Sequence, residues 1–390
     1  MKKAKLAFAT GSRADYGIMR HYLEKLQQDS AIDLQLLVTG ALLDERFGGQ
    51  VRLIEKDGFS IAARLAVPID PSRNAGVIHT MAAALDQFGS YFESHRYDLL
   101  LILGDRYEMM AVALAAAMQR IPILHIHGGE ATYANYDEFI RHAITKMSWF
   151  HFTATEAYRK RVVQLGEDPA RVYNLGALGA ENCLSIDEGT VPEAVSRLPA
   201  KQYFVVLFHP ETLTDKDPLQ QVQQLLQAIR HYPAYQYVFL GANADTHSDV
   251  IRQAVQAFVQ QTENACYFEN LPTDGYHALL KNSICLIGNS SSGIIEAPSL
   301  GIYTINIGDR QKGRVRGNSV LDVPCQAFRI EQAMQQVLRL HQSVRPVNPY
   351  YQTDTAVRYY EATKRILEQL AQGITKEPKV FYDISFDVER

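Results

Sequence analysis

Apolar and polar residues alternate along this chain in two distinct patterns. Short apolar runs rich in β-branched residues are separated by longer stretches in which apolar residues recur at helical spacing. This alternation is typical of parallel sheets wound with helices, so we predict an α/β fold class. In the first half we predict strands at residues 5–9, 33–38, 99–103, 122–126 and 150–153, and helices at 16–28, 77–94 and 107–119. In the second half we predict strands at 203–208, 235–240, 265–268, 283–287 and 303–307.

A polar segment at residues 187–201 separates the two series of strands. A chain of 390 residues is long for one hydrophobic core, because domains usually contain roughly 100–200 residues. We therefore predict two doubly wound domains with parallel sheets, over residues 1–185 and 200–352, followed by a helix and a surface tail over 353–390. Ligands of such sheets bind at the carboxyl ends of the strands, so the candidate site residues are sought in those loops.

Composition narrows the possible functions. The net charge of −4 shows no basic excess, so we expect no nucleic-acid partner. No apolar stretch approaches the length of a membrane-spanning helix, and the apolar run after the basic start is too short for a signal peptide. The four cysteines are scattered without a C-x-x-C pair, which favours reduced thiols and a cytoplasmic protein. His125 and His127 lie on one face of a predicted strand, as a metal pair would, but no H-E-x-x-H helix accompanies them, and we expect no metal.

The loop at 288–298, Gly-Asn-Ser-Ser-Ser-Gly-Ile-Ile-Glu-Ala-Pro, follows a predicted buried strand and opens a short helix. Free backbone N–H groups and the hydroxyls of Ser290, Ser291 and Ser292 suit an anion. Glu296 is expected about one and a half turns into the helix, where its carboxylate can accept both hydroxyls of a ribose. The loop therefore indicates a nucleotide site, although a serine N-cap in a tight turn has the same appearance.

Other loops of the second half add groups that suit phosphate. His209 ends one predicted strand, where it can donate to a phosphate oxygen or transfer a proton, and Asn243 follows the next strand. The last strand is followed by a glycine-rich loop at 308–317 with four cations, Arg310, Lys312, Arg314 and Arg316. Arg13, in the turn after the first strand, can pair with a diphosphate, and that turn lacks the G-x-G-x-x-G spacing of a nicotinamide or flavin site.

The first half supplies carboxylates. Asp105 and Glu130 follow neighbouring predicted strands, where an acid and a base would flank one substrate. Asp137 and Arg141 are four residues apart on a predicted helix and share a face. A helix cap for Asp105 and a solvated ion pair for Asp137 and Arg141 are the structural alternatives. With no Walker A sequence, these carboxylates indicate chemistry on a sugar whose leaving group is a nucleotide.

Six motifs occur together in this chain: residues 10–17 (TGSRADYG), 104–108 (GDRYE), 125–130 (HIHGGE), 140–146 (IRHAITK), 209–212 (HPET) and 288–293 (GNSSSG). In number and order they closely resemble those of the hydrolysing UDP-N-acetylglucosamine 2-epimerases, above all the bacterial branch that makes N-acetylmannosamine for sialic acid. The resemblance spans about residues 5–383. It implies the GT-B architecture of two Rossmann-like domains with the active site between them, a homodimer, a UDP-sugar substrate and no cofactor.

The resemblance also implies a reaction. UDP is eliminated in the anti sense to give 2-acetamidoglucal, and water then adds while C2 is protonated from the opposite face. Asp105, Glu130 and Asp137 resemble the carboxylates that move protons and activate water, and Arg106 and Arg141 the arginines that hold them or the sugar. The residues that resemble the UDP site are Arg13, His209, Asn243, Ser290, Ser291, Glu296 and Arg310, together with the third serine, Ser292.

One position departs from the family pattern. Several relatives carry a glutamate where this chain has His127, so either His127 or Glu130 takes that role. Four alternatives stay open from the sequence: the same chemistry on a UDP-linked diacetamido sugar of the legionaminic acid pathway, a non-hydrolysing epimerase, a GT-B glycosyltransferase, and a non-catalytic nucleotide-sugar sensor. The Gly-Gly-Glu and Ser-Ser-Ser sequences disfavour the non-hydrolysing epimerase.

Overall fold

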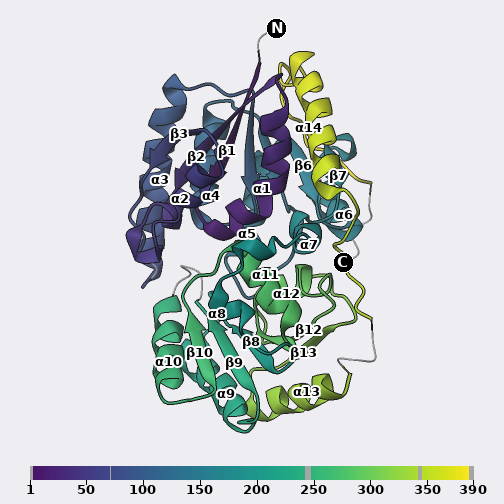
Figure 1. Cartoon of the computed structure of the whole chain (residues 1–390). Helices are drawn as coiled ribbons and strands as arrows, with labels where there is room; N and C mark the ends of the chain where they lie inside the picture. The colour runs from purple at the N-terminus through teal and green to yellow at the C-terminus, as the bar shows by residue number, and fades with distance from the viewer. Residues whose placement is uncertain (1–2, 71, 242–246, 341–344, 386–390) are drawn as a thin grey trace.

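A computed structural model describes residues 3–70, 72–241, 247–340 and 345–385, and it contains two parallel sheets, one in each half of the molecule (Figure 1). The first sheet has seven strands in the order β3-β2-β1-β4-β5-β6-β7. Its strands are β1 (Ala4–Thr10), β2 (Ile32–Thr39), β3 (Ile61–Leu65), β4 (Leu99–Leu103), β5 (Ile123–Ile126), β6 (Phe150–Thr153) and β7 (Val172–Asn174).

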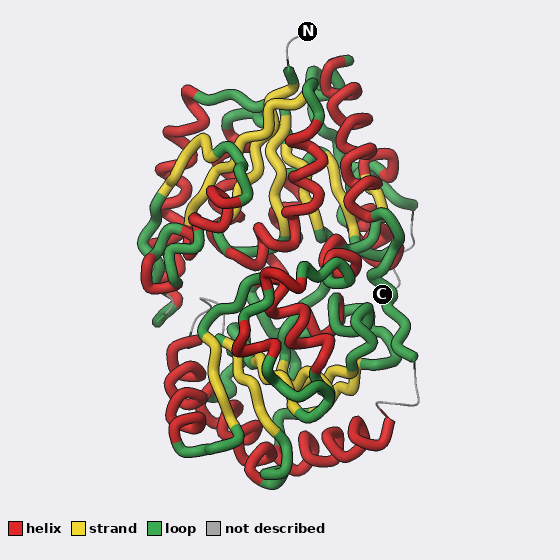
Figure 2. Tube along the Cα trace, in the orientation of Figure 1, coloured by secondary structure: helices red, strands yellow, loops and turns green. Residues whose placement is uncertain are grey.

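The second sheet has six strands in the order β10-β9-β8-β11-β12-β13. Its strands are β8 (Tyr203–Leu207), β9 (Gln236–Leu240), β10 (Ala265–Phe268), β11 (Cys285–Gly288), β12 (Tyr303–Ile307) and β13 (Val320–Val323). Helices separate the strands along the chain, as Figure 2 shows by colour. The architecture is thus two Rossmann-like domains, which confirms the predicted fold class.

Helices cover both faces of the first sheet. One face packs against α1 (Arg13–Gln28) and α14 (Thr355–Ala371), and the other against α3 (Asn74–Ser94), α4 (Tyr107–Met118) and α5 (Asp137–Met147). The C-terminal α14 therefore returns to the N-terminal half, where it lies beside α1 (Figure 1). The hydroxyl groups of Tyr22 and Thr363 hydrogen-bond at 2.6 Å between these two helices. Shorter helices of this half are α2 (Val51–Lys56), α6 (Glu156–Gln164) and α7 (Leu178–Asn182), with 3₁₀ turns at Gly40–Leu42, Glu45–Phe47 and Pro169–Arg171.

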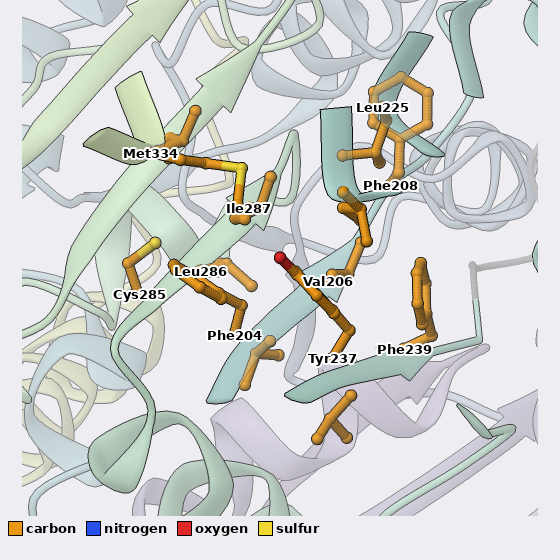
Figure 3. Packing of buried hydrophobic residues seen from close by; sticks show 14 of the residues in the cluster. Phe204, Val206, Phe208, Leu225, Tyr237, Phe239, Cys285, Leu286, Ile287 and Met334 are labelled. Atoms are coloured by element: carbon orange, nitrogen blue, oxygen red, sulfur yellow. The ribbon is translucent and has the colours of Figure 1, made fainter. Parts of the chain in front are cut away.

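The core of the second domain lies between its sheet and a layer of helices (Figure 3). Strands β8, β9, β11 and β12 contribute buried apolar side chains, and partly buried side chains of β10 pack against this cluster. Within it, the rings of Phe204 and Tyr237 stack with centroids 5.6 Å apart. The longer helices are α9 (Pro218–Arg230), α10 (Ser248–Gln260), α11 (Thr273–Asn282) and α13 (Ala327–Leu340), and the shorter ones are α8 (Glu193–Ser196) and α12 (Ser292–Ile295). Such continuous apolar burial is expected of parallel strands covered on both faces.

Three strands were missed by the sequence pattern: β3, β7 and β13. Each is the outermost strand of its sheet. β3 and β13 are only half-buried, and β7 has three residues, so none carries the continuous apolar run that marks the central strands. The predicted polar segment 187–201 contains a 3₁₀ turn at Glu188–Thr190 and the helix α8. The domain boundaries at 185 and 200 stay predictions.

Strand register brings the candidate loops together. Leu103 of β4 pairs with Ile126 of β5, so the loops that carry Asp105 and His127 leave the first sheet side by side. In the second sheet Gly288 of β11 pairs with Leu207 of β8, which brings the serine loop beside His209. No helix in the described part of the chain is both long and apolar enough to span a membrane.

Candidate active site

A cavity of about 250 Å³ lies between the two domains, at the carboxyl ends of both sheets. Loops after β1, β4 and β5 line it from the first domain, and loops after β8, β9, β11 and β12 line it from the second. Of the residues singled out from the sequence, ten line this cavity: Arg13, Asp105, His127, Glu130, His209, Ser290, Ser291, Ser292, Glu296 and Arg314. Arg106, Asp137, Arg141 and Arg310 are not among the residues that line it, and Asn243 lies outside the described residues.

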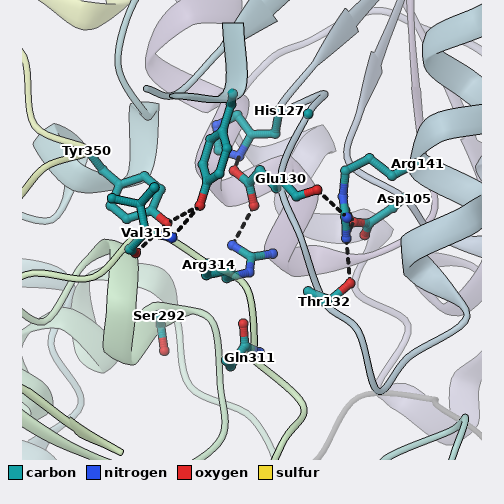
Figure 4. Close-up of polar contacts among 12 residues, drawn as sticks. Asp105, His127, Glu130, Thr132, Arg141, Ser292, Gln311, Arg314, Val315 and Tyr350 are labelled. Atoms are coloured by element: carbon teal, nitrogen blue, oxygen red, sulfur yellow. Dashed lines mark hydrogen bonds and ion pairs between the residues drawn. The ribbon is translucent and has the colours of Figure 1, made fainter. Parts of the chain in front are cut away.

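Arg141 is the charged residue that joins the loops of the first domain. Its side chain is fully buried, and its guanidinium donates to Asp105 Oδ2 at 2.7 Å, to the Glu130 carbonyl at 2.8 Å and to Thr132 Oγ1 at 2.7 Å. It also donates to Glu138 Oε2 at 2.9 Å. Burial raises the pKa of Asp105, but the charges of Arg141 and Arg314 and the hydrogen bond from Arg141 together lower it by more, so this carboxyl stays ionised below its usual range. Arg141 thus fixes the catalytic candidate Asp105 by an ion pair behind the cavity wall (Figure 4).

Asp137 is the first residue of α5 and is half-buried. Its Oδ2 lies 3.5 Å from Asn135 Nδ2. The Asn135 side-chain carbonyl in turn accepts from Thr212 N of the second domain at 3.3 Å. Asp137 therefore lies beside a contact between the two domains.

Glu130 connects the two domains across the cavity. It is 2% exposed, and its Oε2 lies 2.5 Å from Nη1 of Arg314, which belongs to the loop after β12 (Figure 4). Its other oxygen, Oε1, lies 3.4 Å from Nδ1 of His127. Burial lowers the pKa of His127 and Glu130 raises it, with a net shift below the usual value, so the imidazole is neutral at pH 7. Arg314 was one of four cations in a predicted phosphate loop; the structure pairs it with a carboxylate of the other domain.

The His-Gly-Gly-Glu loop adopts a backbone conformation that requires glycine at position 129. Gly129 has φ +79°, and a Cβ on it would lie 2.4 Å from the Tyr158 carbonyl oxygen. His127 also has a left-handed φ of +69°, which is uncommon for a residue with a side chain and costs energy. Its backbone N–H donates to Phe152 O at 2.8 Å. The loop therefore holds His127 in a strained conformation at the cavity wall.

His125 has a structural role beneath the same loops. It is fully buried, with Nε2 2.8 Å from the Gly104 carbonyl oxygen and Nδ1 3.0 Å from Thr145 Oγ1. Burial lowers its pKa to about 3, so the ring is neutral and can donate to the carbonyl that precedes Asp105. No group of three or more His, Cys, Asp or Glu residues in the described chain is arranged to hold a metal ion.

A second acidic group lines the cavity beside Asp105. Asp15, in the first turn of α1, has a carboxylate oxygen without a hydrogen-bond partner among the described residues. Burial raises its pKa to about 6, and Arg106 opposes that shift. Arg106 itself lies 2.6 Å, Nε to Oε1, from the fully buried Glu108. Asp15 lies within the recognised motif at 10–17, but only its burial marks it as a carboxyl that can hold a proton.

The serine loop forms the opposite wall. Ser290 and Ser292 hydrogen-bond through their hydroxyls at 3.0 Å, and Ser292 also contacts the Tyr276 hydroxyl at 2.5 Å. The helix that follows, α12, has only four residues, so Glu296 is its C-terminal cap and does not lie one and a half turns inside a helix. Its Oε2 lies 3.8 Å from His277 Nε2. The predicted placement of Glu296 along the helix was wrong, but the side chain does line the cavity.

Asn289 ties this loop to the others of the second domain. Its side-chain oxygen accepts from His209 N at 2.7 Å, and its side-chain nitrogen donates to His209 O at 2.8 Å. Arg310 donates to the Asn289 carbonyl at 3.1 Å, and Gln311 donates to the same oxygen at 2.9 Å. Arg310 thus supports the loop from behind.

Arg13 reaches from the first domain to the second. Its Nη1 donates to the Leu271 carbonyl, and burial lowers its pKa. Near it, Tyr276 and His277 of α11 line the cavity. Both were missed from the sequence because they lie inside an ordinary amphipathic helix, where no motif marks them.

Comparison with known proteins shows the family and agrees with the fold. The sequence profile of the family described as UDP-N-acetylglucosamine 2-epimerase matches residues 24–364. The chain is 44% identical over 388 residues to the polysialic acid biosynthesis protein P7 of Escherichia coli, covering 97% of both chains. It is 35% identical to the GDP/UDP-N,N'-diacetylbacillosamine 2-epimerase (hydrolyzing) of Campylobacter jejuni, covering 83% of this chain and 85% of that one. The crystal structure of UDP-GlcNAc 2-epimerase from Neisseria meningitidis bound to UDP-GlcNAc is similar with a TM-score of 0.76 at 18% identity, covering 95% of this chain and all of that one.

Proposed function

This chain belongs to the UDP-N-acetylglucosamine 2-epimerase family, and we propose that it is a hydrolysing member that converts UDP-N-acetylglucosamine and water to N-acetylmannosamine and UDP. The observation that carries the proposal is the two-sided cavity. Asp15, Asp105, His127 and Glu130 line one wall, and the serine loop with His209 and Glu296 lines the other. A substrate with a nucleotide at one end and a reacting sugar at the other matches this division.

The serine wall suits UDP. Backbone N–H groups and hydroxyls at Ser290 and Ser291 would receive the diphosphate, with Arg13 and His209 nearby. Glu296 would accept the ribose hydroxyls. Asn243, outside the described residues, is a candidate for the same site from the sequence. The relative of known structure that was crystallised with UDP-GlcNAc supports this choice of ligand.

The acidic wall suits elimination followed by hydration. A base removes the proton at C2 of the sugar, the electron pair forms the C1–C2 double bond, and the C1–O bond breaks with release of UDP. Water then adds at C1 of the glucal while a proton returns to C2 from the opposite face. Asp105, Glu130, Asp137 and His127 are the candidates for these transfers, with Arg106 and Arg141 holding the carboxylates. Closure of the two domains around the bound sugar would exclude water until elimination has occurred.

Two relatives support the hydrolysing outcome and widen the choice of sugar. The 35% identical Campylobacter jejuni protein is named as hydrolysing, and it acts on a diacetamido sugar. The polysialic acid name of the 44% identical relative favours N-acetylglucosamine and a place in sialic acid biosynthesis. The same reaction on a UDP-linked diacetamido sugar is therefore the second candidate. We also expect the protein to be cytoplasmic and to form a homodimer. Light scattering of the purified protein would test the oligomeric state.

Proton NMR in deuterated water tests the proposal. Purified protein is mixed with UDP-N-acetylglucosamine without added metal or nicotinamide, and we expect UDP and N-acetylmannosamine with deuterium at C2. Turnover only of the UDP-linked diacetamido sugar would select the second candidate. Turnover that requires an acceptor sugar would indicate a glycosyltransferase, and UDP binding without turnover of either donor would indicate a sensor.

Asp105→Asn is the matched test of the acidic wall. The amide keeps the shape of the side chain but loses its charge, so we expect turnover to fall at least about 100-fold, as for loss of a proton-transfer group. The dissociation constant of UDP, measured by calorimetry, should stay within about threefold, because the serine wall is untouched. Near wild-type rates in this variant would remove Asp105 from the catalytic set.

A further inference from the structure

His127 occupies a position in the cavity that suits proton transfer. It is 8% exposed and lines the cavity, and its backbone φ of +69° is held by the loop on which it lies. Its Nδ1 faces Glu130, while Nε2 has no hydrogen-bond partner among the described residues. A strained backbone, a buried ring, one ring nitrogen beside a carboxylate and the other without a hydrogen-bond partner are together typical of a histidine that transfers protons.

Glu130 is held from two sides. Arg314 of the second domain lies 2.5 Å from its Oε2, and His127 lies 3.4 Å from its Oε1. Arg314 is positioned by the loop after β12, whose Val315 N–H donates to the Tyr158 hydroxyl at 2.9 Å. The Tyr350 hydroxyl donates to the Val315 carbonyl at 2.8 Å (Figure 4). Three elements distant in sequence therefore converge to fix one carboxylate.

The other carboxylate candidates are less suited to act as the base. Asp105 is ion-paired with Arg141, and its lowered pKa makes it a weaker proton acceptor, while one carboxylate oxygen of Glu130 is engaged by Arg314. A neutral imidazole keeps its basic nitrogen available. Among the groups that line the acidic wall, His127 Nε2, Asp15 Oδ2 and Glu130 Oε1 have no hydrogen-bond partner within the described residues, and His127 is the one of these groups that is an uncharged base lying against a neighbouring carboxylate.

We propose that His127 is the base that removes the C2 proton, that Glu130 positions it, and that Arg314 of the other domain positions Glu130. Nδ1–H of His127 donates to Glu130, which leaves the lone pair of Nε2 facing the sugar. Nε2 takes the proton from C2, the C–H electron pair becomes the C1–C2 double bond, and UDP leaves with the electrons of the C1–O bond. The imidazolium formed is stabilised by Glu130. This inference rests on the proposed function and assigns one of its steps.

The tautomer of His127 tests the arrangement without turnover. Protein labelled with ¹⁵N at histidine, saturated with UDP, is examined by long-range proton–nitrogen NMR, and His127→Gln assigns the signal. We expect the Nδ1–H tautomer in the wild type, and a mixture of tautomers in Glu130→Gln and in Arg314→Gln. Arg329→Gln, an exposed arginine of α13, is the matched control and should leave the spectrum unchanged. An Nε2–H tautomer in the wild type, or one that Glu130→Gln does not alter, would overturn the proposal.

Kinetics with the substrate of the proposed reaction supplies the second test. His127→Gln should lower kcat at least about 100-fold, with the dissociation constant of UDP within about threefold. Glu130→Gln should lower kcat by at least about tenfold, and the double variant should be no slower than His127→Gln, because residues that act as a unit are not additive. Independent, multiplying losses would refute a shared role, and wild-type rates in His127→Gln would refute its role as base.

The two tests separate this inference from the proposed function. If the wild type turns over neither UDP-sugar, the proposed function fails, whereas the tautomer still decides whether Glu130 and Arg314 orient His127. If the wild type epimerises its substrate but His127→Gln does so equally well, the function stands and the assignment of the base fails.

Discussion

Replacing Arg141 by methionine should destabilise the N-terminal domain by about 3 kcal/mol. The change removes a guanidinium that donates to four oxygen atoms and leaves Asp105 and Glu138 without it. Breaking a buried ion pair by removing one partner costs about 3–5 kcal/mol, because the remaining charge is uncompensated. Asp105 and Glu138 have side chains that are 21% and 22% exposed, so water partly solvates them and the lower end of that range applies.

Trp149 provides the assay, because it is the only tryptophan of the chain and its backbone N–H donates to the Ile123 carbonyl of β5 at 2.9 Å. Its fluorescence therefore reports unfolding of the first domain. With a urea slope of about 3 kcal/mol per molar, a loss of about 3 kcal/mol lowers the midpoint by about 1 M. The double variant Asp105→Asn with Arg141→Met should recover part of this loss, because the uncompensated carboxylate is gone.

The pH dependence of the same transition gives the refuting result. In the wild type the pKa of Asp105 lies below its usual value, so its contribution to stability is present above about pH 4 and is lost only as pH falls through the lowered pKa. Without Arg141, burial dominates and raises that pKa, so Arg141→Met should gain stability relative to the wild type as pH falls from 7 towards 4. A midpoint shift below about 0.3 M at pH 7, or parallel pH profiles, would contradict the reasoning, since about 1 M is expected.

Three further changes test other parts of the cavity. Folding raises the pKa of Asp15 from 3.8 to about 6, so the ionised carboxylate destabilises the wild type as pH rises from about 4 to 7. Asp15→Asn removes this effect and should therefore gain stability relative to the wild type over that range, by at most roughly 2–3 kcal/mol. Urea midpoints of both proteins at pH 5 and pH 8 measure the gain, and the same difference between the two proteins at both pH values would be evidence against it. Glu296→Ala should weaken UDP binding at least about tenfold in calorimetry while leaving the fold intact, since it removes a charged hydrogen-bond acceptor, and an unchanged dissociation constant would exclude it from the ribose site. Gly129→Ala should destabilise the protein by at least about 2 kcal/mol, because φ is +79° and its Cβ would meet Tyr158 O at 2.4 Å; Gly89→Ala, with no atom near its Cβ, is the control in thermal unfolding, and equal melting temperatures for the two variants would contradict the steric argument.

Much of the site could be predicted because its residues follow central strands. The continuous apolar runs of β4, β5, β8 and β11 mark where each strand ends, so Asp105, His127, His209 and Ser290 could be assigned to loops at the same edges. The position of Glu296 was predicted less well, because the length of α12 depends on its packing and the serine motif does not encode it.

Sequence patterns alone predicted the central strands of both sheets, the loops that carry chemistry and the family. These depend on local patterns, namely apolar periodicity and short motifs, which a reader can recognise without knowing how the chain folds. Which charges pair became visible only in the folded chain. Arg314 lies 184 residues after Glu130 in sequence (314 − 130) yet contacts it at 2.5 Å, and Arg141 joins Asp105 across 36 residues. Ion pairing and burial depend on distances in space between segments far apart in the chain. The fold therefore decides that the His127 imidazole is neutral, that the pKa of Asp15 is raised, and that Glu130 and Arg314 form an ion pair between the domains.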